Sequence, residues 1–214
     1  MKNNYKTLII LDWDDTLFPT SWLVKMNIDL HSPNHRNHHY KKYFAKLDKL
    51  ISRLLIICMQ FGRVVIVTNA LPTWISISTS VLPRTHKLTQ YIKILSARDE
   101  YQCHSKNAYD WKIMAFKDEL SNYLNSDVIS NQSTNQQIYN IISIGDAEYE
   151  YKALINLYNW NKKHNKILKS IKLIKNPSLD ILYDELDVLI DSMQKIAQGK
   201  VHMDLNFNQT EHEL

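Results

Sequence analysis

Acidic and hydroxyl side chains stand directly behind stretches of hydrophobic residues, at the points where strands of a parallel sheet would end. Asp12 and Asp14 follow the first such stretch, Thr68 closes the second, and Asp146 follows a later one. In an open parallel sheet these strand ends meet at one edge, where ligands bind. Carboxylates gathered there from distant parts of the chain would repel one another, and a divalent cation would remove that penalty. Oxygen ligands with few neutral donors favour Mg²⁺, which is commonly held together with a phosphate.

The glycine content limits how a phosphate could be held. The chain of 214 residues has only three glycines, Gly62, Gly145 and Gly199, and no two of them are close together. This excludes the glycine-rich loops of dinucleotide-binding proteins and of P-loop nucleotidases, because both need several glycines within a few residues. A phosphate site in this protein must therefore use side chains, strand-end amides and a metal ion.

Alternating strand and helix patterns would position these residues. Four continuous hydrophobic stretches and a weaker fifth predict buried strands at residues 6–12, 63–68, 91–97, 138–145 and 171–175. Apolar residues at three-four spacing predict helices at residues 38–61, 110–124, 148–160 and 179–198. Strands separated by helices indicate right-handed crossovers. We therefore expect a three-layer α/β/α sandwich, with a Rossmann-like parallel sheet of about five strands and helices on both faces.

The chain length and the pattern of elements predict one domain over residues 1–199. Two segments interrupt the pattern: residues 18–37 are predicted to form a small flap or loop, and residues 126–137 a polar surface loop. Residues 200–214 are predicted to form a loose C-terminal tail. Gly62 directly follows the first long helix, where a left-handed helix cap is expected.

The composition, with 44% hydrophobic and 22% charged residues, is ordinary for a globular protein. No stretch approaches the roughly 20 apolar residues that a membrane span needs. The polar N-terminus with its short apolar run is unlike a signal peptide, and two cysteines are too few for a disulfide framework. We therefore expect a reduced, cytoplasmic protein without a membrane partner, with a nuclear location left open.

The charge distribution bears on possible partners. The net charge is +4, and seven lysines but no acidic residue lie between Tyr151 and Leu179. Such a stretch could meet an anionic partner. Charge without a zinc-finger, RRM or helix-turn-helix motif is weak support for nucleic-acid binding. We therefore expect these lysines to form a solvated surface, and we do not expect a nucleic-acid partner.

Four motifs resemble those of the haloacid dehalogenase (HAD) superfamily, in its branch of aspartate-nucleophile phosphatases. They are the stretches DWDDT, VIVTN, DWKIMAF and IISIGDAEYE, in this order along the chain. Their key residues are Asp12, Asp14, Thr16, Thr68, Lys112, Asp146 and Glu150. A single motif of this kind would be a weak indication, but four in order, each at a strand end or a helix start, are specific. The resemblance spans about residues 6–175.

The resemblance implies a division of labour at the acidic end of the site. Asp12 would attack phosphorus and form an aspartyl-phosphate. Asp14 would protonate the leaving group and then activate water. Mg²⁺ would be bound by Asp12, by the backbone carbonyl of Asp14 and by Asp146. Glu150 would hold a metal-bound water or Lys112.

The resemblance also implies which residues bind the phosphoryl group. Thr68 and Lys112 would bind its oxygens, with Asn69 and the loop that contains Thr16 adding further donors. Lys106 is an alternative to Lys112. The spacing favours Lys112, because a helix places a charge more precisely than a loop does.

Members of this superfamily often carry a cap domain over the site, inserted between the first three motifs. Neither residues 16–68 nor residues 68–112 leave room for a folded domain of ordinary size. The site is therefore predicted to be open to large phosphorylated substrates such as phosphoproteins. We expect a Mg²⁺-dependent hydrolase of phosphomonoesters. The alternatives are a phosphotransferase of the same superfamily and a non-catalytic interaction protein that retains the fold.

Overall fold

The structure is a computed structural model that describes residues 5–32, 38–129 and 137–207. Its centre is a sheet of six strands in the order β3-β2-β1-β4-β5-β6, and every neighbouring pair is parallel. The strands are β1 (Tyr5–Leu11), β2 (Arg63–Thr68), β3 (Lys93–Ser96), β4 (Ile138–Gly145), β5 (Asn165–Lys172) and β6 (Met203–Asn206). The predicted fold class is confirmed, with one strand more than expected.

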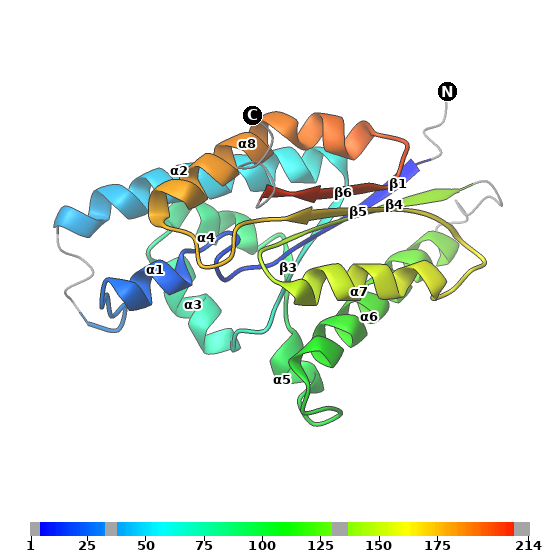
Figure 1. The fold of residues 1–214 in the computed structure, drawn as a ribbon, viewed down its shortest axis with the longest axis horizontal. Coiled ribbons are helices and arrows are strands. Elements are labelled where there is room, and N and C mark those ends of the chain that lie inside the picture. Colours follow the sequence, from blue (N-terminus) through cyan, green and yellow to red (C-terminus); the bar gives the residue numbers. More distant parts are fainter. Residues whose placement is uncertain (1–4, 33–37, 130–136, 208–214) are drawn as a thin grey trace.

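Helices cover both faces of the sheet. They are α1 (Thr20–Lys25), α2 (His38–Phe61), α3 (Pro72–Ser80), α4 (Pro83–Thr89), α5 (Ala97–Tyr101), α6 (Ala108–Ile129), α7 (Glu148–Asn159) and α8 (Leu179–Gln198). Helices α2 and α8 pack together on one face, and α6 and α7 pack together on the other (Figure 1). The long helices at residues 38–61 and 179–198 are confirmed with the predicted bounds.

The two helical layers explain why hydrophobic residues follow one another in the central strands. Along β1, Ile9 and Leu11 belong to the core cluster that includes α2 and α8. Leu8 and Ile10, which point to the opposite face, belong to the cluster that includes α6 and α7. Because both faces of a central parallel strand are buried, alternation of polar and apolar residues is absent.

The fifth strand lies earlier in the chain than predicted, at residues 165–172 rather than 171–175. The sequence pattern does not reveal this strand, because lysines interrupt its hydrophobic residues. Lys169 is fully buried, and its ammonium donates to the carbonyls of Ile196 and Gly199 at 2.6 Å each. The prediction that the lysine-rich stretch is a solvated surface is therefore wrong at Lys169. This side chain binds backbone carbonyls at the C-terminal end of α8.

Residues 72–89, where the sequence patterns predict no helix, form two short helices that begin with Pro72 and Pro83. Proline is favourable at the first helical position, because that N–H has no intrahelical partner.

Three loop predictions are revised. Residues 203–206, predicted to lie in a loose tail, form β6 and pair with β5; the rest of that tail from residue 208 lies outside the described residues. Helix α1 occupies part of the predicted flap, whose residues 33–37 are likewise outside. Helix α6 extends to Ile129, into the predicted polar loop, and residues 130–136 are not among those described.

Gly62 does not provide a left-handed helix cap, because no described glycine has a positive φ. Its role is close packing. A Cβ atom at this position would lie 2.1 Å from the backbone oxygen of Thr7 in β1. Any larger residue would push the start of β2 away from β1.

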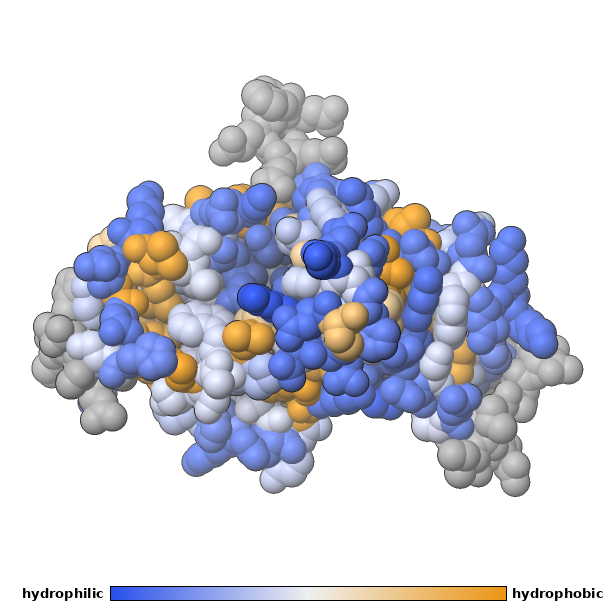
Figure 2. Space-filling view, turned by 90° about the horizontal axis from the view of Figure 1, so that it is seen from below, coloured by the Kyte–Doolittle hydropathy of each residue, from blue (hydrophilic) through white to orange (hydrophobic). Residues whose placement is uncertain are grey.

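The face that carries α6 and α7 is mainly polar, and its hydrophobic residues form small separate groups (Figure 2). Ile155 and Tyr158 on α7 are among the exposed hydrophobic side chains. Among the described residues, no helix combines the length and apolar character needed to cross a membrane.

Candidate active site

The sheet topology brings Asp12 and Asp146 together. They follow β1 and β4, which are neighbours at the point where the strand order reverses direction. This is the place where open α/β sheets bind ligands. The backbone amide of Asp12 donates to the carbonyl of Ile144 at 2.9 Å, so the pairing of the two strands extends to the first site residue.

Three buried carboxylates form the centre of the site. Asp12, Asp146 and Glu150 each offer an oxygen within 4.8 Å of the others, and they are 8%, 7% and 3% exposed. Glu150 comes from the first turn of α7. A Cβ at Gly145 would lie 2.4 Å from the Glu150 Cγ. The absence of a side chain at Gly145 is therefore what allows Glu150 to reach the cluster.

Lys112 joins this cluster from α6. It is fully buried, and its ammonium lies 2.7 Å from an oxygen of Asp12 and 2.7 Å from an oxygen of Glu150. The same nitrogen donates to the Val67 carbonyl at 2.5 Å. Lys106, the alternative from the sequence, is exposed. The structure thus places Lys112, and not Lys106, against the carboxylates.

Burial dominates the electrostatics of the cluster. It raises the pKa of Asp12 well above its usual value, despite the opposing charge of Lys112. Burial and then the charge of Glu150 raise the pKa of Asp146 to about 7. Burial alone would lower the pKa of Lys112, but the charges of Asp12 and Glu150 outweigh it and the pKa rises. One ammonium therefore does not compensate the three acids.

This donor set fits a metal ion. Asp12, Asp146 and Glu150 together could hold one, and an added divalent charge would stabilise all three ionised forms. Carboxylate oxygens without a cysteine or histidine among them are typical ligands of hard cations such as Mg²⁺ and Ca²⁺.

The Asp14 carboxylate forms hydrogen bonds with a different set of residues. Its Oδ1 accepts the indole N–H of Trp74 at 2.7 Å and the hydroxyl of Thr20. Its Oδ2 accepts the hydroxyl of Thr68 at 3.4 Å. Trp74 and Thr20 were not predicted from the sequence, because both lie on segments whose path was unknown. The tryptophan shortly after the second motif indicates a partner of Asp14 only when α3 is known to begin there.

The remaining predicted residues lie around the cluster. Thr16 is fully buried, and its hydroxyl contacts an Asp146 oxygen at 3.5 Å, so it supports this carboxylate. Thr68 accepts the Ala70 amide at 3.0 Å and is fully buried as well. The Asn69 side-chain oxygen is buried and has no hydrogen-bond partner among the described residues. An unpaired buried acceptor is costly, which is consistent with a ligand at this position.

The loop after β1 is fixed by Asp15, which has a left-handed φ of 52°. Aspartate tolerates this conformation better than most residues. Its carboxylate accepts the Ser21 amide at 2.8 Å and the Ser21 hydroxyl, which ties the loop to the first turn of α1. The Ser21 hydroxyl also lies 3.1 Å from the side-chain oxygen of Asn176, after β5.

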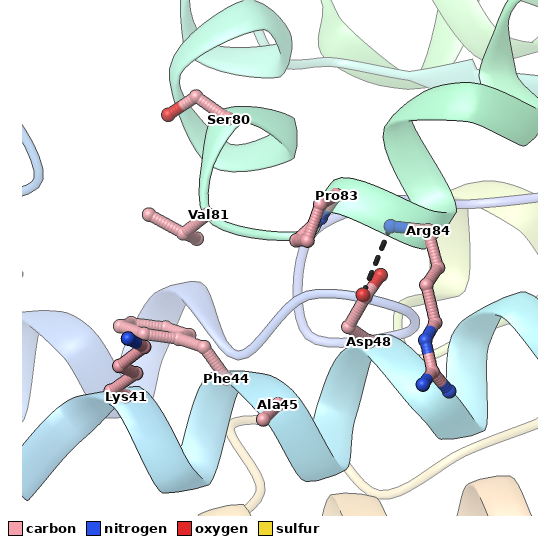
Figure 3. Close-up of a pocket in the computed structure, with 8 residues that line it drawn as sticks. All are labelled: Lys41, Phe44, Ala45, Asp48, Ser80, Val81, Pro83 and Arg84. Atoms are coloured by element: carbon pink, nitrogen blue, oxygen red, sulfur yellow. Dashed lines mark hydrogen bonds between the residues drawn. The ribbon is translucent and has the colours of Figure 1, made fainter.

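A separate pocket of about 560 Å³ lies between α2 and the connection from α3 to α4 (Figure 3). It is lined by Lys41, Phe44, Ala45, Asp48, Ser80, Val81, Pro83 and Arg84. Figure 3 shows the Asp48 carboxylate turned toward the Arg84 backbone nitrogen, which donates at 3.0 Å. Asp48 also accepts the Thr85 amide at 2.8 Å, so its carboxylate binds two backbone amides in the first turn of α4. The acidic cluster is the stronger candidate site despite the size of this pocket, because it gathers groups that can react.

Comparison of the chain with family models, with curated proteins and with solved structures gives no match.

Proposed function

We propose that the protein is a Mg²⁺-dependent phosphatase that hydrolyses phosphomonoesters through an aspartyl-phosphate on Asp12, in the manner of the HAD superfamily. One observation carries this proposal: two carboxylates two residues apart have opposite surroundings. Asp12 lies within the acidic cluster beside Lys112, whereas Asp14 lies outside it among hydrogen-bond donors. A metal ion and Lys112 beside Asp12 would keep this nucleophile ionised, whereas Asp14, outside the cluster, can exchange a proton with the leaving group and with water.

The proposed reaction has two steps. A carboxylate oxygen of Asp12 attacks phosphorus, and the bond between phosphorus and the leaving oxygen breaks. The electron pair stays on the leaving oxygen, which takes a proton from Asp14 and departs as an alcohol. A water molecule then gives its proton to the ionised Asp14 and attacks phosphorus. This releases phosphate and restores the Asp12 carboxylate.

The other residues of the site would bind and stabilise the phosphoryl group. Mg²⁺, when held by Asp12, Asp146 and the backbone carbonyl of Asp14, with Glu150 beside them, would neutralise charge on the phosphoryl oxygens. Lys112 lies next to Asp12 and adds a second positive charge, as phosphoryl transfer requires. Thr68 and Asn69 lie at the end of β2, where the Thr68 hydroxyl and the Asn69 backbone N–H would donate to phosphoryl oxygens.

The substrate is proposed to be large, for instance a phosphoprotein. In the described residues, the chain between Thr16 and Thr68 forms α1 and α2, and the chain between Thr68 and Lys112 forms α3, α4, β3 and α5. Hydrophobic residues of these elements belong to the two core clusters or pack against them. A site without a separate covering domain can admit a macromolecule.

Hydrolysis of an aryl phosphate, measured with Mg²⁺ and with EDTA, tests this function. We expect turnover only with the metal, and its loss in Asp12→Asn. Asp48→Asn is the matched control, because it removes a buried carboxylate that lies outside the cluster. Metal-independent turnover, or an Asp12→Asn variant as active as the control, would contradict the proposal.

A further inference from the structure

The two oxygens of the Asp14 carboxylate have unequal surroundings. Oδ1 accepts the Trp74 indole N–H at 2.7 Å and the Thr20 hydroxyl. Oδ2 has the longer contact of 3.4 Å, with the Thr68 hydroxyl. A hydrogen-bond donor cannot point at an oxygen that carries a proton in the same direction. Two donors on Oδ1 therefore direct the proton of a neutral Asp14 to Oδ2, on the side of Thr68.

The indole that makes this contact is held firmly. The Trp74 ring packs edge-on against Phe18, with centroids 5.9 Å apart, and Phe18 stacks on Trp13 at 6.0 Å. The Trp13 indole N–H in turn donates to the Ser78 hydroxyl of α3 at 2.9 Å. The loop after β1 and helix α3 are thus joined by the ring contact of Phe18 with Trp74 and by hydrogen bonds at Trp13 and at Asp14.

We infer that Trp74 and Thr20 are positioning residues, which hold the general acid Asp14 so that its Oδ2 faces the leaving group. This inference rests on the proposed phosphatase function and adds residues from outside the four motifs to it. A proton donor must lie within hydrogen-bond reach of the leaving oxygen in the transition state. A carboxyl group without these two donors would rotate, and its proton would be out of place in most conformations.

The dependence of kcat/KM on the leaving group tests this role. The substrates are dinitrophenyl, nitrophenyl, phenyl and alkyl phosphates, whose leaving oxygens need a proton to an increasing degree. kcat/KM reports the first chemical step, since it compares the free enzyme with the transition state. We expect Trp74→Phe, which keeps a ring but loses the N–H, to lower kcat/KM about ten- to hundredfold for phenyl and alkyl phosphates. Little change is expected for dinitrophenyl phosphate.

Trp111→Phe is the matched control, because the Trp111 indole donates at the same distance of 2.7 Å, but to the backbone carbonyl of Ser105. It should lower kcat/KM equally for all substrates or leave it unchanged. Thr20→Val should reproduce the leaving-group dependence of Trp74→Phe, and Thr20→Ser, which restores the hydroxyl, should remove it.

The outcomes separate this inference from the proposed function. An equal loss for every leaving group in Trp74→Phe, or the same selective loss in Trp111→Phe, would overturn the positioning role while the phosphatase remains. A wild-type protein that hydrolyses none of the substrates with Mg²⁺ would overturn the proposed function and this inference together.

Discussion

The substitution Asp146→Asn is expected to stabilise the metal-free protein, although it removes a residue of the proposed metal site. Asp146 is 7% exposed, and burial together with Glu150 raises its pKa from 3.8 to about 7. At about 1.4 kcal/mol for each pH unit, ionising it in the folded state costs up to about 4 kcal/mol. Local relaxation and water penetration reduce this value, so we expect a measured gain of about 1–3 kcal/mol.

The pH dependence gives this prediction its sign. A carboxyl whose pKa is higher in the folded than in the unfolded state binds its proton more tightly when folded. Its penalty is therefore fully developed above about pH 7 and shrinks as the pH falls toward the unfolded value of 3.8. Asparagine does not titrate, and it keeps an oxygen that can accept the Thr16 hydroxyl. The advantage of Asp146→Asn should therefore be largest near pH 8 and nearly absent near pH 4.

Thermal unfolding followed by circular dichroism in EDTA measures this effect. A gain of about 1–3 kcal/mol corresponds to about 2–12 °C in Tm for a domain of this size. Mg²⁺ at about 100 times its Kd should then add about 2.7 kcal/mol to the wild type, and much less to the variant. Asp48→Asn, which weakens the start of α4, should lower Tm. A lower Tm of Asp146→Asn at pH 8 in EDTA, or a gain independent of pH, would refute the reasoning.

Two further substitutions test other parts of the site. Lys112→Met leaves Asp12 and Glu150 without their cation, so it should destabilise the protein by about 3–5 kcal/mol and lower kcat at least about 100-fold. Denaturant titration measures the stability, and steady-state kinetics measure kcat. An active and equally stable variant would refute the role of the lysine. Gly145→Ala should displace Glu150 and weaken Mg²⁺ binding measured by calorimetry. Gly199→Ala is its control, because the only atom that a Cβ there would approach within 3.0 Å is the flexible end of the Met203 side chain. Similar Mg²⁺ affinity in both variants would refute the packing argument.

The parts of the fold that were predicted well have a clear pattern of hydrophobic residues along the sequence. Most residues of β1, β2 and β4 are hydrophobic because helices cover both faces, and α2 and α8 show the spacing of a helix with one buried side. The shifted β5 lacks this signal. The burial of Lys169 depends on two carbonyls at and after the end of α8, and those carbonyls are distant in the sequence.

The candidate site likewise has features that the sequence predicts and features that it does not. Asp12 and Asp146 could be paired from the sequence, because parallel strands place their ends at one edge. Lys112 could be favoured over Lys106 by its helical position alone. The contact between Trp74 and Asp14 joins residues 60 positions apart and depends on the path of the loop after β1. The steric need for Gly62 likewise depends on how closely β1 approaches it, which the sequence does not state.

A trapped phosphoryl group on Asp12 is the most direct test of the proposed mechanism. Asp14→Asn should still react with dinitrophenyl phosphate and Mg²⁺, because this leaving group departs without a proton, but it should hydrolyse the intermediate slowly. Acid quenching followed by peptide mass spectrometry should then find a phosphoryl group on Asp12, and none when Asp12→Asn is added. Turnover without any phosphorylated peptide, or with the phosphoryl group on another residue, would contradict the account.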